Sequence, residues 1–340
     1  MASADPTDLW LSEKIPLAYD REKLDKWASE EVGPIVYLKL GVTYRCQLQC
    51  RHCCAGNHPE DNRRELTTEE VKDAIDQCYK PLVVHFFGGE PTLRSDLIEL
   101  IDYAANKSVF VFFDTNGLLI TRDYAARLKA TALELIHVSI DSPVPRKHDE
   151  YRGLEGCFDR ALQGIKNALD AGLKCAISTY ATRESLENGE FEDTIRLGRR
   201  LGVTGVRYQL PTPSGRWLHE VDVKLTPEEE ERLRELVDFP SVYRDFHFQN
   251  QTSSQCRGIA AGQYAYISPL GEIQPCSFMP LSFGNIREEP VKTIFERMWK
   301  HPIYSEPCIS EECPMLSDEF RGKYIDTIPV DADLPFKVMS

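Results

Sequence analysis

Three cysteines stand close together near the start of the chain, in the segment Cys46-Gln47-Leu48-Gln49-Cys50-Arg51-His52-Cys53. Their C-x3-C-x2-C spacing places three thiols on one loop, which can wrap three irons of a [4Fe–4S] cube. Three thiolates leave the fourth iron open to another ligand. A zinc site is the alternative, with His52 or Cys54 as the fourth ligand that zinc normally requires. We read Cys54 as a small buried thiol.

Four further cysteines lie near the C-terminal end, with 19, 31 and 4 residues between successive members: Cys256, Cys276, Cys308 and Cys313. Cys276 follows the hairpin signal Pro269-Leu270-Gly271, and the last two lie in a turn-rich segment. These surroundings indicate loop ligands of a metal or cluster, and a structural zinc is the alternative. The other cysteines fall in predicted helices or strands, where we expect core packing: Cys78, Cys157 and Cys175.

Glycines and polar residues follow several apolar runs. The segment Gly88-Gly89-Glu90-Pro91 combines glycines, which let a backbone approach a ligand closely, with a carboxylate that could pair with an ammonium group. A simple turn is the alternative. Further polar candidates are Asn116, Ser139, Asp141, Arg152 and Ser178, although each could instead cap a helix or stabilise a turn. Arg216, in the predicted turn Pro213-Ser214-Gly215-Arg216, could hold an anionic substrate or only stabilise that turn.

The elements that must position these residues form repeated βα units, because short apolar runs alternate with amphipathic stretches. The predicted strands are Ile35–Gly41, Leu82–Phe87, Val109–Asp114, Leu133–Ile140, Leu173–Tyr180 and Val206–Leu210. The predicted helices between them are Thr68–Tyr79, Ser95–Asn106, Thr121–Thr131, Cys157–Ala171 and Phe191–Leu201. Thr67 and Thr226 each resemble a helix start, with a threonine cap and acidic residues in the first turn. Such units form a partial barrel or a doubly wound sheet, and in both the chemistry lies at the carboxyl ends of the strands.

The composition is that of an ordinary folded protein, since 42% of the 340 residues are hydrophobic. The net charge is −14 and no long basic block occurs, so we expect no nucleic-acid partner. We find no apolar run of the roughly 20 residues that cross a bilayer and no signal peptide, which predicts a cytoplasmic protein without a membrane partner. Eleven cysteines in such a chain favour metal or cluster ligation over disulfides.

The cysteine loop and the glycine segment together resemble the radical S-adenosylmethionine (SAM) superfamily, over about residues 35–216. The resemblance implies a partial (β/α)6 TIM-like barrel of α/β class. It also implies that the open iron of the first cluster is chelated by the amino and carboxylate groups of SAM. In that case the ligands of this catalytic cluster are Cys46, Cys50 and Cys53.

The same resemblance implies roles for the polar residues. Gly88, Gly89 and Glu90 match the segment that binds the methionine amino group of SAM. His52 stands where the family usually carries an aromatic side chain near the adenine. The remaining candidates match more loosely a region that touches the ribose or carboxylate of SAM: Asn116, Ser139, Asp141, Arg152 and Ser178.

The C-terminal region resembles the twitch domain, a shortened relative of the SPASM domain, over about residues 255–314. The likeness includes the segments from Pro269 to Cys276 and from Gly284 to Glu288. It implies one auxiliary [4Fe–4S] cluster, held by the four C-terminal cysteines. Four thiolates would saturate that cluster, so it would pass electrons, whereas three would leave an iron open for substrate. We therefore predict an extension at 1–34, a barrel at 35–249, a small α+β iron–sulfur domain at 250–328 and a tail at 329–340.

The resemblance implies an enzyme that cleaves SAM to a 5′-deoxyadenosyl radical, which removes a hydrogen atom from the substrate. We expect a small-molecule substrate, such as a sugar, a nucleoside or a tetrapyrrole, and a reducing partner such as flavodoxin or ferredoxin. About 34 residues precede the first predicted strand, too few for the fused peptide-recognition domain of many peptide-modifying relatives. The alternatives are a maturase that modifies a peptide or protein, and a non-catalytic zinc or cluster scaffold.

Overall fold

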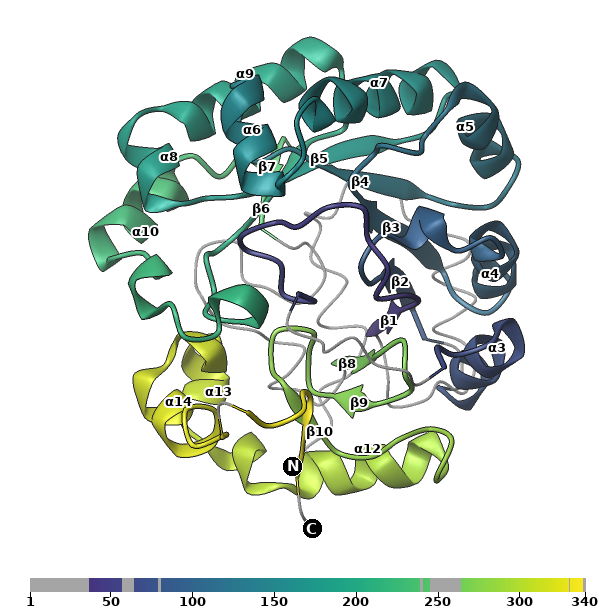
Figure 1. Cartoon of the computed structure of the whole chain (residues 1–340), viewed down its shortest axis with the longest axis vertical. Helices are drawn as coiled ribbons and strands as arrows, with labels where there is room; N and C mark the ends of the chain where they lie inside the picture. The colour runs from purple at the N-terminus through teal and green to yellow at the C-terminus, as the bar shows by residue number, and fades with distance from the viewer. Residues whose placement is uncertain are drawn as a thin grey trace.

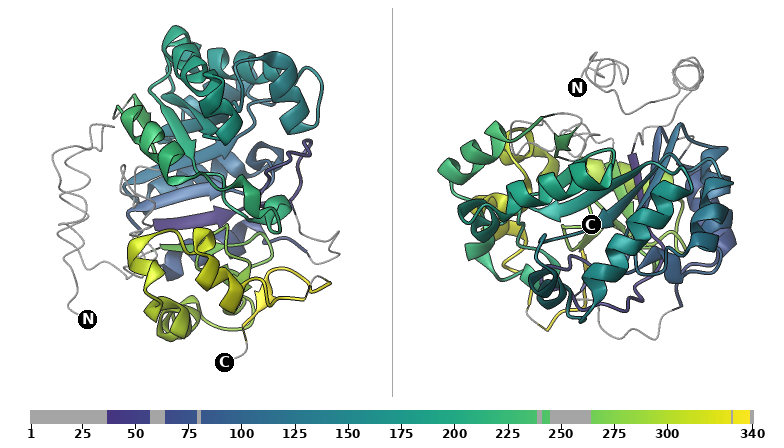
Figure 2. Two further views of the ribbon diagram at one scale, coloured as in Figure 1. Left: turned by 90° about the vertical axis from the view of Figure 1, so that its left-hand side faces the viewer. Right: turned by 90° about the horizontal axis from the view of Figure 1, so that it is seen from above.

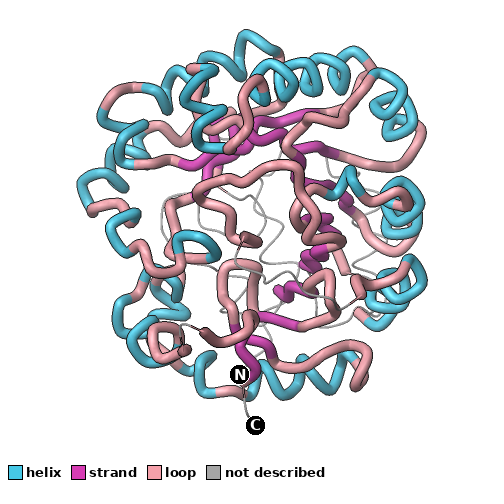
Figure 3. Tube along the Cα trace, viewed as in Figure 1, coloured by secondary structure: helices cyan, strands magenta, loops and turns pink. Residues whose placement is uncertain are grey.

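The computed structural model describes residues 37–56, 64–78, 81–238, 241–244, 264–329 and 331–338. Its main feature is a nine-stranded sheet with the order β7-β6-β5-β4-β3-β2-β1-β8-β9. The strands are β1 (Tyr37–Gly41), β2 (Val83–Phe87), β3 (Phe110–Thr115), β4 (Leu135–Ser139), β5 (Cys175–Tyr180), β6 (Val206–Gln209), β7 (Val242–Tyr243), β8 (Tyr264–Ile267) and β9 (Ile273–Gln274). Neighbouring strands are parallel except in the antiparallel β8–β9 pair. Figure 3 shows the strands as an arc enclosed by helices.

Helices cover the outer side of this arc. The helices between β1 and β7 are α3 (Thr68–Gln77), α4 (Leu97–Ala105), α5 (Arg122–Lys129), α6 (Pro145–Arg152), α7 (Cys157–Asp170), α8 (Arg183–Glu187), α9 (Glu190–Leu201) and α10 (Pro227–Glu235). In Figure 1, α3, α4, α5, α7 and α9 follow one another around the outside of the sheet. The predicted partial barrel is confirmed, and all six predicted strands occur as β1 to β6.

Two helices and one strand of the barrel part of the chain were not predicted. β7 has only two residues, and α6 and α8 are short and polar, so none of them produces a clear hydrophobic period. Two predicted helix starts are confirmed, because Thr67 and Thr226 each form a capping box with a glutamate three residues later.

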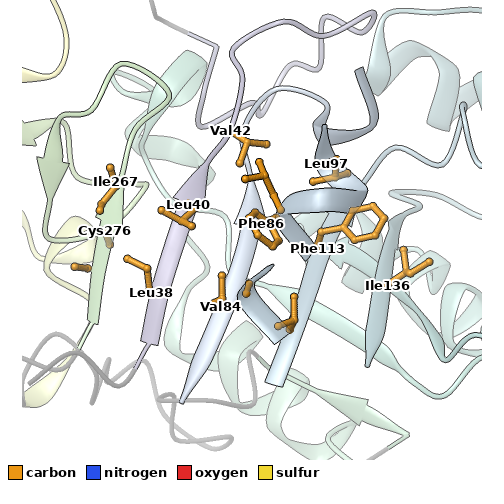
Figure 4. Close-up of a cluster of buried hydrophobic side chains, with 14 of the residues drawn as sticks. Leu38, Leu40, Val42, Val84, Phe86, Leu97, Phe113, Ile136, Ile267 and Cys276 are labelled. Atoms are coloured by element: carbon orange, nitrogen blue, oxygen red, sulfur yellow. The ribbon is translucent and has the colours of Figure 1, made fainter. Parts of the chain in front are cut away.

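Alternate residues of the strands face opposite sides of the sheet. One set forms the main apolar core between the sheet and its helices, and Figure 4 shows Leu38, Leu40, Phe86 and Phe113 gathered there with Leu97 of α4. Each fully buried side chain of this size contributes about 1.5–3 kcal/mol of burial free energy. The other set faces the inside of the barrel and includes the buried residues Lys39, His85, His137 and Arg207. The inside of the barrel therefore holds buried polar and charged side chains.

The C-terminal segment continues the barrel sheet, because β8 pairs in parallel with β1 and places Tyr266 beside Lys39. The remaining elements are α12 (Val291–Lys300), α13 (Cys308–Glu311), α14 (Asp318–Tyr324) and the parallel pair β10 (Leu281–Ser282) and β11 (Phe336–Lys337). In the left view of Figure 2 these elements lie beside the β1 end of the sheet. Among the helices in the described ranges, none has the length and apolar character needed to cross a membrane.

Replacing either of two helical glycines by alanine should change the free energy of unfolding, in opposite directions. A Cβ on Gly164 of α7 would lie 2.3 Å from the carbonyl oxygen of Gly117, whereas a Cβ on Gly322 of α14 would meet no atom within 4 Å. We expect Gly164→Ala to lower the free energy of unfolding by about 1–3 kcal/mol through overpacking. Gly322→Ala, the matched control, should raise it by up to about 1 kcal/mol because alanine favours the helix. Urea denaturation measures both, and equal effects would contradict the close packing of α7.

Candidate active site at the carboxyl ends of the strands

The cysteine loop follows β1 and is held by its backbone against the end of α6. The amide of Gln49 donates to the carbonyl of Arg152 at 3.0 Å, and the amide of Arg51 donates to the carbonyl of Tyr151 at 2.9 Å. Cys46 is exposed, Cys50 is buried and Cys53 is half-buried. The three thiols thus lie on a loop anchored at a strand end, as the spacing predicted.

The two glycines after β2 pack directly on this loop. A Cβ on Gly88 would lie 2.3 Å from the carbonyl oxygen of Thr43, and one on Gly89 would lie 2.4 Å from that of Arg45. Gly88 also has a φ of +146°, which favours glycine. The amide of Gly89 donates to the Thr43 carbonyl at 2.6 Å. The glycines therefore have a packing role that does not depend on a ligand.

Glu90 is buried and accepts hydrogen bonds from three residues. Its carboxylate receives the Thr92 amide and hydroxyl, the Thr115 hydroxyl at 2.7 Å and the Asn116 amide at 2.7 Å. Burial raises the pKa of Glu90 although these donors oppose the shift. A cation placed beside this carboxylate would favour its charged form. The site therefore fits the ammonium group of SAM.

Asn116 offers a further polar atom to the cavity. Its side-chain carbonyl accepts from the amide of Leu118 at 3.0 Å. Its Nδ2 atom is buried and has no hydrogen-bond partner among the described residues. A buried donor without a partner costs free energy unless a ligand or water accepts its hydrogen bond. The donor set around the cavity thus fits a polar ligand such as SAM.

Asp141, Arg152 and His52 form a second polar group beside the cysteine loop. Arg152 Nε lies 2.6 Å from Asp141 Oδ2, and His52 Nε2 lies 3.4 Å from the same oxygen. Burial opposes ionisation of Asp141, but the Arg152 charge prevails and holds its pKa below the usual range. Arg152 Nη1 also donates to Cys50 Sγ at 3.6 Å. Arg152 therefore connects the Asp141 carboxylate to one of the predicted cluster ligands.

His52 lies in an aromatic group. Its ring centre is 4.6 Å from that of Tyr180 and 5.6 Å from that of Trp217. Burial lowers the pKa of His52 to about 4. The neutral imidazole therefore offers a flat, uncharged ring at the wall of the cavity.

One cavity, about 780 Å³ when its opening to solvent is included, brings the predicted residues of the first site together. The predicted residues that line it are Cys46, Cys50, His52, Cys53, Gly88, Gly89, Glu90, Asn116, Ser139, Asp141, Arg152 and Ser178. Cys54 also lines this cavity and is half-buried, so our interpretation of it as a small buried thiol was wrong. It directly follows Cys53, which lines the same cavity. The core prediction for Cys78, Cys157 and Cys175 is confirmed, since all three are buried.

A buried polar network inside the barrel was not predicted from the sequence. Asp114 Oδ2 lies 3.1 Å from His85 Nε2 and 2.9 Å from Arg207 Nη2, and its Oδ1 lies 3.0 Å from His137 Nδ1. Arg207 also donates to the Ser178 hydroxyl at 2.8 Å. A signal was present, because strands buried on both faces are normally apolar throughout. A histidine or arginine in the middle of such a strand therefore indicates a polar barrel interior.

This network predicts that acid destabilises the fold. Burial lowers the pKa of His85 to about 3 and that of His137 to about 4. The unfolded chain then binds more protons than the folded one between about pH 4 and 6.5, so stability rises with pH in that window. We expect the free energy of unfolding to be lower at pH 5 than at pH 6.5 by more than about 1 kcal/mol.

Urea denaturation at the two pH values measures this difference. His137→Gln should reduce the pH dependence, while the matched variant His219→Gln, at an exposed position, should leave it as in the wild type. Equal stability of the wild-type protein at pH 5 and pH 6.5 would refute the assignment of neutral buried histidines.

The auxiliary cysteines are placed in part. Cys276 is buried in the main apolar core. Cys308 and Cys313 are half-buried and pack against that core. Cys256 lies outside the described residues. Phe278, two residues after Cys276, lines the same cavity as the first cysteine loop. The segment that carries Cys276 therefore reaches the cavity of the first cysteine loop through Phe278.

Comparison with known proteins decides the family. A model of the radical SAM superfamily matches residues 40–198, and a model of an iron–sulfur cluster-binding domain matches residues 256–314. The AdoMet-dependent heme synthase of Nitratidesulfovibrio vulgaris is 32% identical over 312 residues, which cover 83% of this chain and 82% of that protein. The chain belongs to the radical SAM superfamily.

Two further proteins are similar to this chain. The mycofactocin maturase MftC of Mycolicibacterium smegmatis is 33% identical over 330 residues, covering 88% of this chain and 82% of that protein. The solved structure of native anSMEcpe with bound AdoMet has the same fold, with a TM-score of 0.63, 18% identity and coverage of 88% of this chain and 92% of that one. This radical SAM protein is therefore an enzyme that uses SAM and [4Fe–4S] clusters. The zinc and scaffold alternatives are set aside.

Proposed function

We propose that this enzyme uses a 5′-deoxyadenosyl radical, which the SAM-bound cluster supplies, to oxidise a small molecule, with the auxiliary [4Fe–4S] cluster as electron acceptor. The composition of the cavity wall is the main support for this proposal. A single cavity is lined by Cys46, Cys50 and Cys53 and also by Phe278, which closely follows Cys276. A substrate in this cavity would lie between the two cluster segments.

The chain's own residues would bind and orient SAM. Glu90 would accept from its ammonium group and Asn116 Nδ2 would donate to one of its oxygens, since both groups line the cavity. His52, Tyr180 and Trp217 offer flat rings against which the adenine could stack. The pairing of Arg152 with Asp141 would keep both charges satisfied beside the cysteine loop.

The remaining part of the cavity supports a small polar substrate. Lys39, Arg207 and Gln209 line it together with Phe87 and Phe278. The Lys39 ammonium donates to the Ser277 hydroxyl at 3.0 Å and lies 3.6 Å from the centre of the Phe87 ring. These polar and aromatic side chains lie beside the residues placed against SAM and offer contacts to a small polar substrate.

Anaerobic purification and reconstitution test the proposal. We expect about eight irons per chain, which corresponds to two [4Fe–4S] clusters, and formation of 5′-deoxyadenosine from SAM and dithionite. With the correct small molecule, oxidised product should form in proportion to 5′-deoxyadenosine. About four irons with full SAM cleavage would remove the electron-acceptor role. Absence of 5′-deoxyadenosine from a fully loaded protein would overturn the proposal.

A peptide maturase is the second candidate, because one relative of similar length and 33% identity is named a mycofactocin maturase. Co-expression with short peptides encoded beside its gene, followed by mass spectrometry, separates the two candidates. A defined mass change in such a peptide, dependent on Cys46, would favour the maturase. Turnover of a small molecule without any peptide change would favour the first proposal.

A further inference from the structure

The segment after β6 lies directly on the cysteine loop. We call residues 213–218, which include the short helix Gly215–Trp217, the strut. The amide of Arg216 donates to the carbonyl of Cys53 at 3.0 Å, and its Nη1 donates to the carbonyl of Cys50 at 3.0 Å. Gly215 has a φ of +52°, and a Cβ there would lie 2.1 Å from the Cys53 carbonyl oxygen. The strut and the loop are thus in backbone contact.

The other side of the strut is held by a buried arginine of α14. Arg321 is 1% exposed and donates from Nη1 to the carbonyl of Pro213 at 3.0 Å. Its Nη2 donates to the carbonyl of Leu218 at 2.7 Å and lies 2.6 Å from Asp326 Oδ1. One guanidinium therefore holds both ends of the strut.

The helix that carries Arg321 begins close to the auxiliary cysteines. The amide of Leu316 donates to the carbonyl of Cys313 at 2.8 Å, and α14 starts at Asp318. Lys224, which follows the strut in the chain, donates to the carbonyl of Leu316 at 2.8 Å. Hydrogen bonds joined by short stretches of backbone therefore connect the Cys313 segment, through Arg321 and the strut, to the Cys50 and Cys53 carbonyls.

We infer that the strut is a positioning device that couples the auxiliary-cluster segment to the catalytic cluster. Arg321 fixes the strut, and Arg216 is a positioning residue that fixes the backbone of two cluster ligands and brings a positive charge to them. This inference rests on the proposed role of Cys46, Cys50 and Cys53 as cluster ligands. Hydrogen bonds and charge near a cluster shift its reduction potential. Arg216 therefore favours the reduced state that SAM cleavage requires.

The contacts of Arg216 distinguish this role from simple turn stabilisation. Arg216 is exposed, yet its guanidinium donates to a carbonyl of another loop, and in the described part of the chain no hydrogen bond joins that guanidinium to its own turn. The next residue, Trp217, packs on the ring of His52 between the second and third cysteines. Loss of the strut would therefore disturb the cysteine loop at several points.

Reconstituted Arg216→Gln protein tests the first half of the inference. We expect the iron content to stay at about eight per chain, because the side chain is exposed. At a fixed electrode potential, the ratio of reduced to oxidised catalytic cluster should fall roughly fivefold. A change of this size corresponds to the net free energy of one ordinary hydrogen bond. Its electron paramagnetic resonance spectrum with SAM should also change. Arg216→Lys should restore part of the potential, and Arg200→Gln on the exposed face of α9 is the matched control.

Arg321 tests the coupling. Arg321→Met should change the spectrum and potential of the catalytic cluster in the same direction, and its effect should not add to that of Arg216→Gln. If Arg321→Met does not fold, Asp326→Asn serves instead, because it weakens the ion pair that orients the Arg321 guanidinium and changes only a half-exposed side chain. A potential and spectrum equal to those of the wild type in Arg216→Gln would overturn the inference. Failure of the proposed function is distinct, since the wild-type protein itself would then form no 5′-deoxyadenosine.

Discussion

Cys46→Ala is expected to abolish formation of 5′-deoxyadenosine from SAM and dithionite. Cys46 begins the C-x3-C-x2-C loop and lines the cavity with Cys50 and Cys53. Two thiolates are too few to hold the cluster, so the variant has no open iron to which SAM can bind. The iron content should fall from about eight to about four per chain, because only the auxiliary cluster remains. Mass spectrometry and iron analysis of the reconstituted variant measure both effects.

Cys54→Ala is the matched control for this experiment. Cys54 is adjacent to Cys53 and lines the same cavity, but it stands outside the C-x3-C-x2-C spacing. We expect its iron content and rate of SAM cleavage to stay near the wild-type values. Full activity of Cys46→Ala, or a matching loss in Cys54→Ala, would contradict the ligand assignment.

Asp114→Asn is expected to destabilise the barrel by about 3–5 kcal/mol, the cost of breaking a buried ion pair. Burial alone would raise the pKa of Asp114, but Arg207 and the two histidines hold it well below its usual range. Arg207 is 1% exposed, so loss of the negative charge facing it cannot be compensated by water. Asparagine has nearly the same shape, and the effect therefore reports the charge.

Urea denaturation of the anaerobically prepared protein measures this effect. Asp159→Asn, in the first turn of α7 and exposed, makes the same chemical change at the surface. We expect it to alter the free energy of unfolding by no more than about 0.5 kcal/mol. Equal stability of the two variants would mean that the Asp114 network contributes little to the fold.

Much of the barrel could be predicted from local patterns. The period of apolar residues located β1 to β6, and a threonine followed three residues later by glutamate located the starts of α3 and α10. These signals are short-range, because a cap or a strand depends on residues within a few positions of each other. The short elements β7, α6 and α8 escaped because they bury too few apolar residues to create a period.

The sequence by itself determined the chemistry of the first site, since three thiols within eight residues must share one loop wherever that loop lies. It did not determine which distant residues meet. Asp114 joins His85, His137 and Arg207 only because four parallel strands align in one register, and β8 continues the sheet only because it pairs with β1. Likewise Arg216 reaches Cys50, and Arg321 reaches the strut, over separations of more than 100 residues. Such contacts depend on strand order and on the packing of whole elements, which no local spacing encodes.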